Sequence, residues 1–155
     1  MTINTVTIEK WIDTLNAIWA FEDGRGRTVR AARVNEFPEA LNLGEGPAAL
    51  SFPDTVAAKY GASSSSMPTI LIWHGTTEIH LTPDVNKNNL AYILPFFGRI
   101  LNAAKINMTL GGLVEYFVLE EENAMSLDVL KYGGEEPHYA ITIRWMVKQN
   151  LSGQI

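Results

Sequence analysis

The sequence contains no cysteine, few charged residues and no long hydrophobic run. Without cysteine the chain has no disulfide, thiolate metal site, iron–sulfur cluster or cysteine nucleophile. For the same reason, cysteine usage does not indicate whether the protein works in an oxidising or a reducing compartment. No segment approaches the roughly 18 uncharged apolar residues of a membrane-spanning helix, and the first residues lack the basic and apolar regions of a secretory signal. We therefore expect a protein made in a cytosol, with no membrane partner.

The chain has 155 residues, which predicts a single domain over residues 1–155 whose core needs no metal or disulfide. Charged residues make up only 19% of it, against four Trp, five Tyr and six Phe. The net charge of −5 argues against a dedicated nucleic-acid binder, which would favour a basic surface. A surface with little charge and many aromatic residues is typical of a protein that contacts partners.

Two segments have the three- and four-residue apolar spacing of helices. The first covers residues 5–21 and ends at Asp23-Gly24, and the second covers residues 86–106. Pro95 lies inside the second segment, where proline removes a backbone hydrogen bond. We expect either a kink or two helices that meet near Leu94.

The rest of the pattern predicts strands and loops. Residues 48–52 form a strand candidate closed by Pro53, and residues 69–82 form either one long strand or a hairpin turned at Gly75. Three more strands are expected at residues 113–120, 126–132 and 138–148, with loops at residues 37–47 and 61–66. This order predicts an α+β fold: a mixed or antiparallel sheet with two main helices packed on it and long extended loops.

No motif in the sequence carries a recognisable reaction. His74, Glu78 and His80 share strand parity, but we expect Gly75 to break that strand, and the two histidines would lie about 20 Å apart along an extended chain at roughly 3.3 Å per residue. The serine tract at 63–66 suits a solvated loop, and residues 23–28 lack the Gly-Lys-Ser/Thr of a phosphate-binding loop. We expect no enzyme, no metal and no cofactor, and a role in binding or assembly.

Charged residues cluster in two parts of the chain. The basic cluster comprises Arg25, Arg27, Arg30 and Arg33, with no acidic residue between them. It is either a solvated loop or a contact strip for an acidic partner surface or DNA phosphate. The acidic clusters comprise Glu120, Glu121, Glu122, Glu135 and Glu136. Acidic residues at strand ends are typical of solvated turns that keep a sheet edge from pairing wrongly.

Several segments together resemble the tail terminator (tail completion) proteins of long-tailed bacteriophages. In the C-terminal half they are Leu90–Arg99, Leu110–Val114 and Tyr132–Gly134 leading into Tyr139–Trp145, and upstream they are Pro38–Leu41 and Pro47–Pro53. The resemblance covers most of the chain and rests on order, spacing and length. It implies an α+β subunit of a homo-hexameric ring that caps the tail tube, stops its polymerisation and joins it to the head–tail connector.

The resemblance also implies where the protein acts. It would be assembled in the host cytoplasm and sit in the virion at the head-proximal end of the tail, with the tail tube protein and the connector protein as partners. Genomic DNA would pass through without specific binding, and no reaction or cofactor belongs to this role. The alternatives are another neck or tail-tube component, or a small phosphate-ligand-binding domain or enzyme that uses the arginine cluster.

The acidic clusters acquire a second interpretation from this role. The last 50 residues hold seven acidic and three basic residues. An acidic inner wall would keep passing DNA from sticking, because phosphate contacts make DNA binding tight. We therefore predict that some of the acids among Glu120, Glu121, Glu122, Glu135 and Glu136 line the lumen of the ring, and that Arg25 to Arg33 contact a neighbouring subunit or partner.

Overall fold

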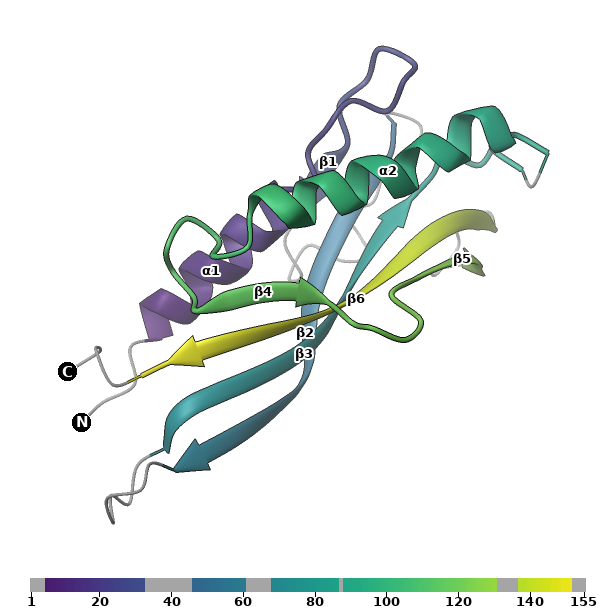
Figure 1. Ribbon diagram of the computed structural model, residues 1–155. Coiled ribbons are helices and arrows are strands. Elements are labelled where there is room, and N and C mark those ends of the chain that lie inside the picture. Colours follow the sequence, from purple (N-terminus) through teal and green to yellow (C-terminus); the bar gives the residue numbers. More distant parts are fainter. Residues whose placement is uncertain (1–4, 33–45, 61–67, 87, 131–136, 152–155) are drawn as a thin grey trace.

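The computed structural model describes residues 5–32, 46–60, 68–86, 88–130 and 137–151 (Figure 1). The expected loop at 61–66 and most of the one at 37–47 lie outside these residues. The elements are α1 (Thr5–Ala17), β1 (Arg30–Ala32), β2 (Ala48–Tyr60), β3 (Pro68–His80), α2 (Leu90–Ile106), β4 (Tyr116–Leu119), β5 (Met125–Leu130) and β6 (His138–Asn150).

The strands form one mixed sheet, which confirms the α+β fold with two helices packed on a sheet. Its order is β1-β2-β3-β6, and both β4 and β5 pair with the remaining edge of β6. The short β1 runs parallel to β2, and all the other pairings are antiparallel. Both helices lie on one face of the sheet, α1 against β1 and β2 and α2 against β4, with α2 in front of the sheet in Figure 1.

The core lies between the helices and one face of the sheet. Strand alternation places Ile141, Ile143, Trp145 and Val147 on that face, as their shared parity predicts. The helices contribute Trp11, Leu15 and Trp19 from α1, and Ile93, Phe96 and Ile100 from α2. The opposite face of β3 and β6 carries polar side chains, among them His74, Thr76, Thr142 and Arg144. We call this the polar sheet face.

Residues 69–80 form one continuous strand, so the expectation of a break at Gly75 is wrong. Gly75 pairs directly with Trp145 of β6. A Cβ atom at position 75 would lie 2.2 Å from the Trp145 ring. Glycine therefore stands here because the indole lies over the backbone of the neighbouring strand, and not because the strand turns.

Two prolines also lie inside elements that they were expected to end. β2 continues through Pro53 to Tyr60, with a register shift between Pro53 and Thr55. Within the described ranges β1 pairs only with residues 48–50, so Pro53 lies on an edge of the described sheet, where a missing N–H disrupts no ladder. α2 is a single helix with Pro95 inside it, so of the two alternatives for this segment, a kink or two helices that meet near Leu94, the second is wrong.

Candidate assembly surfaces

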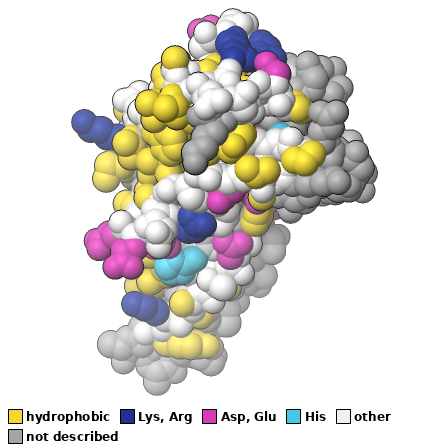
Figure 2. All heavy atoms as spheres, turned by 90° about the vertical axis from the view of Figure 1, so that its right-hand side faces the viewer, with side chains coloured by type: hydrophobic (Ala, Val, Ile, Leu, Met, Phe, Trp, Pro, Cys, Tyr) yellow, Lys and Arg dark blue, Asp and Glu magenta, His cyan; other side chains and the backbone are white. Residues whose placement is uncertain are grey.

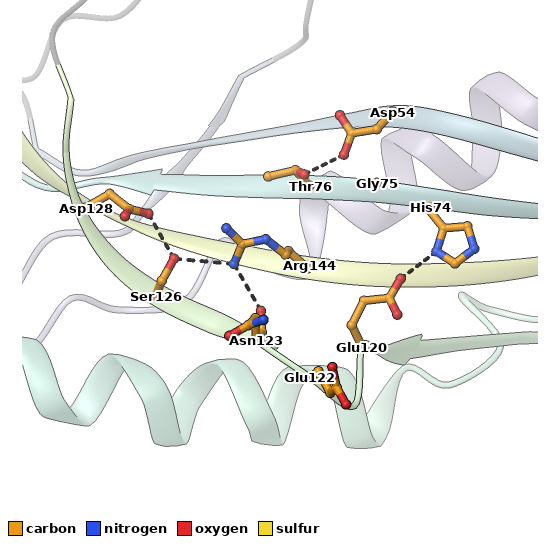
Figure 3. Close-up of a pocket in the computed structure, with 10 residues that line it drawn as sticks. All are labelled: Asp54, His74, Gly75, Thr76, Glu120, Glu122, Asn123, Ser126, Asp128 and Arg144. Atoms are coloured by element: carbon orange, nitrogen blue, oxygen red, sulfur yellow. Dashed lines mark hydrogen bonds and ion pairs between the residues drawn. The ribbon is translucent and has the colours of Figure 1, made fainter.

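A polar groove of about 540 Å³ lies on the polar sheet face (Figure 3). On one side, His74 Nδ1 lies 2.5 Å from Glu120 Oε1, and Thr76 donates a hydrogen bond to Asp54 at 2.6 Å. On the other side, Asp128 accepts hydrogen bonds from Ser126 and Thr142. Carboxylates from β2, β5 and the end of β4 thus surround one shallow groove.

Arg144 shapes the edge of this groove by holding a loop between β4 and β5. The Glu120 amide donates to the Arg144 carbonyl at 2.9 Å, and the Arg144 amide donates to the Ala124 carbonyl at 2.8 Å. Residues 121–123 are therefore looped out of an edge strand that is otherwise paired with β6 on both sides. The Arg144 guanidinium closes the loop with a hydrogen bond to the Asn123 carbonyl at 3.0 Å.

We call the looped-out residues Glu121, Glu122 and Asn123 the acidic bulge. Because of this bulge, the three consecutive glutamates at 120–122 have different environments. Glu120 and Glu122 both line the groove, Glu120 partly buried and Glu122 exposed, whereas Glu121 is exposed and lies outside the lining. Asn123 has a φ of 55°, a left-handed conformation that asparagine tolerates better than most residues. Glu135 and Glu136 lie outside the described residues. The sequence signals an acidic turn here, but not that the same edge strand resumes after it.

The loop between α1 and β1 is organised around a buried carboxylate. Asp23 Oδ1 accepts hydrogen bonds from the amides of Arg25 and Arg27 at 2.8 and 3.0 Å. Asp23 Oδ2 accepts from the Arg27 guanidinium at 3.2 Å and from the Tyr92 hydroxyl of α2 at 2.9 Å. These four donors pin the loop against α2 and use the acceptor capacity of the carboxylate.

The electrostatics of this cluster follow from burial and hydrogen bonding. Burial alone raises the pKa of the Asp23 carboxyl, but the hydrogen bonds from Arg25, Arg27 and Tyr92 and the charge of Arg27 together hold that pKa below its ordinary value. Burial and the neighbouring Asp23 raise the pKa of Tyr92 to about 12. Asp23 is therefore ionised and Tyr92 protonated at neutral pH.

The arginines of the predicted contact strip have separate environments. Arg25 is exposed, lies 4.1 Å from the centre of the Tyr92 ring and pairs with Asp84 at 3.0 Å. Arg27 is engaged by the buried Asp23, and Arg30 of β1 donates to the Gly46 carbonyl at 3.0 Å. The structure thus brings Arg25 and Arg27 together around Asp23, places Arg30 elsewhere, and does not describe Arg33.

The outward face of α2 is apolar, which the sequence analysis did not single out. Its buried face includes Tyr92, Ile93, Phe96 and Ile100. Three exposed leucines, Leu90, Leu94 and Leu101, follow one another along one side of the helix, and Ile106 and Met108 are exposed at and just after its C-terminal end. We call the three leucines the α2 stripe, and Figure 2 shows hydrophobic side chains gathered on this side of the molecule.

A signal for the α2 stripe was present in the sequence. Residues 90–106 include only two charged side chains, Arg99 and Lys105. A helix that is apolar on nearly all sides is typically buried on all sides. Leu94 is 57% exposed and Leu101 is 51% exposed, so this helix has an apolar face that the described part of the chain does not cover.

Among the described residues, no group of three or more His, Cys, Asp or Glu side chains is placed to hold a metal ion. No helix in the described ranges is long and apolar enough to cross a membrane. The chain matches no family model, and a search of curated proteins finds none similar to it.

Proposed function

We propose that the protein is a structural subunit of a phage tail, a tail terminator that assembles as a hexameric ring, caps the tail tube and joins it to the head connector. The observation that carries this proposal is the α2 stripe. Leu90, Leu94 and Leu101 are each more than half exposed, and they follow one another at helical spacing. Such a contiguous apolar face on a chain with few charges is typical of an interface between subunits.

A ring places specific demands on its subunit. Each copy in a head-to-tail ring uses two different surfaces, one for each neighbour. The α2 stripe supplies one apolar surface, and the exposed edge of β2 beyond Pro53, residues 54–60, supplies a second candidate. Among the described residues, that edge has no partner strand beyond Leu50. Exposed strand edges readily pair with another chain.

The polar sheet face is the candidate wall of the lumen. Its groove collects Asp54, Glu120 and Asp128, with Arg144 held by the Asn123 carbonyl and Ser126. In this arrangement Glu120 of the predicted lumen acids faces the passing DNA, while Glu121 and Glu122 belong to the acidic bulge at the edge of the sheet, where Glu122 also borders the groove. The carboxylates in this groove outnumber its one arginine, Arg144, so the lining as a whole is acidic and does not favour binding of DNA phosphates.

The test is the mass of the protein in solution together with images of the particles. We expect a species of roughly six times the 17.2 kDa subunit, seen as a six-fold ring in negative stain. Replacing Leu94→Lys and Leu101→Lys together should shift the protein to monomers and leave folding intact, because both side chains are exposed. Asn102→Lys is the matched control, since this exposed residue lies beside the stripe on the same helix.

A protein that stays monomeric at high micromolar concentration would contradict the proposal. Locating the chain in a virion separates it from the nearest alternative, because a terminator sits once between tube and connector whereas a tube protein repeats along the tail. The alternative of a phosphate-binding domain or enzyme calls for a deep pocket that contains two of the clustered arginines. The pocket beside Asp23 contains Arg25 but neither Arg27 nor Arg30.

A further inference from the structure

A second pocket, of about 330 Å³, lies between the α1–β1 loop and α2. Arg25 and Arg99 bring two guanidinium groups to it, and Tyr92 and Pro95 form part of its wall. The only acidic residue in the lining, Asp23, already accepts hydrogen bonds from four donors. The pocket is therefore a place where positive charge is available to an incoming anion.

Arg99 has an unused donor in this pocket. Its Nη1 atom is buried and has no hydrogen-bond partner among the described residues. Its Nη2 atom lies so close to Gly24 that a Cβ there would come within 3.2 Å, and Gly24 has a φ of +85°. Glycine at position 24 thus leaves the space that the guanidinium occupies. A buried donor without an acceptor is unfavourable, and a carboxylate that enters the pocket would remove that cost.

Arg25 is able to take part in the same contact. Its guanidinium lies over the Tyr92 ring, and its ion pair with Asp84 is on the surface, where the Asp84 side chain is 67% exposed. Ion pairs this exposed contribute little, so Arg25 loses little by turning to another carboxylate. Arg25 and Arg99 then form a pair of forks of the kind that binds carboxylates with two parallel hydrogen bonds.

The acidic bulge has the complementary features. Glu121 and Glu122 are exposed, and their side chains have no hydrogen bond or ion pair within the described part of the chain. The loop that carries them is held by Arg144 through its backbone and its guanidinium. The backbone that carries the two carboxylates is therefore fixed at the sheet edge before binding. As a result, little conformational entropy is lost when the carboxylates bind.

The pocket and the acidic bulge belong to different parts of one subunit. The α1–β1 loop rises at the top of Figure 1, while the loop between β4 and β5 lies at the lower right. A closed head-to-tail ring needs such a pair of unlike, complementary patches on each subunit. We propose that the pocket of Arg25, Tyr92 and Arg99 receives the carboxylates of Glu121 and Glu122 from the neighbouring copy of this chain. This inference rests on the proposed ring.

A charge-swap experiment tests the contact. Arg99→Glu and the double change Glu121→Arg/Glu122→Arg should each weaken assembly by about tenfold or more, measured by sedimentation equilibrium, since each places like charges against one another. The protein that combines all three changes should regain most of the lost assembly. Arg99→Gln, which removes the charge but keeps the length, should give an intermediate loss and guards against a folding defect of the Glu variant.

The control is Lys10→Glu, which makes the same charge change at an exposed position of α1, outside both the pocket and the α2 stripe, and should leave assembly unchanged. Rings that form equally well with Arg99→Glu or Arg99→Gln would overturn the inference. Losses that add in the combined variant instead of cancelling would overturn it as well. An unmodified protein that forms no ring would overturn the proposed function first, whereas intact rings without charge-swap rescue would overturn only this contact.

Discussion

Gly75 and Trp145 are coupled across the middle of the sheet. The two residues pair on adjacent strands, and the indole lies where a side chain at position 75 would be. The Trp145 N–H donates to the Thr77 hydroxyl at 3.0 Å, so the ring is held by a hydrogen bond as well as by packing. Protein interiors are close-packed, and the indole therefore has little room to move aside.

Gly75→Ala should destabilise the protein by about 1–3 kcal/mol, because its methyl group overlaps the Trp145 ring. Chemical denaturation monitored by tryptophan fluorescence measures the effect. The matched control is Gly98→Ala on α2, where an added Cβ meets nothing within 4 Å. Alanine there should stabilise the helix by roughly 0.5–1 kcal/mol. Equal effects of the two changes would contradict the account of Gly75.

Asp23 should make stability depend on pH. Because its pKa is lowered in the folded state, the carboxylate stabilises the fold at neutral pH, and this contribution is lost as the pH falls through the ordinary carboxyl range towards the folded value. Asp23→Asn should cost about 2 kcal/mol at pH 7, since an amide leaves some of the four donors without an acceptor. Urea unfolding from pH 7 to pH 3 measures both effects.

The difference between Asp23→Asn and the unmodified protein should shrink as the pH falls, since protonated Asp23 also loses its charge-assisted hydrogen bonds. Glu9→Gln on the exposed surface of α1 is the control, and it should leave the stability profile unchanged. A constant difference across this range would show that Asp23 acts only through packing.

At the scale of elements, two prolines do not end the strand and the helix that contain them, although local sequence rules predict that they would disrupt both. Pro53 is accommodated because no strand of the described part of the chain pairs with its edge at that point. Pro95 is accommodated because it lies about one and a half turns into a helix whose exposed side it occupies. Ala91, whose carbonyl would accept the bond from residue 95, is exposed as well, so water can satisfy it. Both cases depend on what lies beside the element.

Pro95→Ala should therefore stabilise the isolated subunit by about 1–3 kcal/mol, because the helix regains a hydrogen bond at a position with helical backbone. The midpoint of chemical denaturation, measured at a concentration too low for assembly, reports this directly. A loss of stability would mean that the proline ring makes contacts in the fold that outweigh the missing hydrogen bond.

At the scale of the whole molecule, the fold separates three kinds of surface. The polar sheet face gathers carboxylates around Arg144, the apolar α2 stripe lies on the outside of the opposite layer, and the arginine pocket lies where the α1–β1 loop meets α2. The sequence has few charged and many aromatic residues, so its composition predicts that part of the surface is uncharged and apolar. The structure places much of that surface on one helix.

The amino-acid pattern predicts the fold class, both helices and the strands of the C-terminal third, because apolar periodicity reports which face of an element is buried. It also predicts the acidic turn at 120–122. Three features depend on the folded arrangement: β2 and β3 continue through Pro53 and Gly75, Asp23 gathers Arg25 and Arg27 around one carboxylate, and Arg99 joins Arg25 in a pocket. These outcomes depend on neighbours far away in the chain, whereas local patterns describe only a residue and the few residues on either side of it.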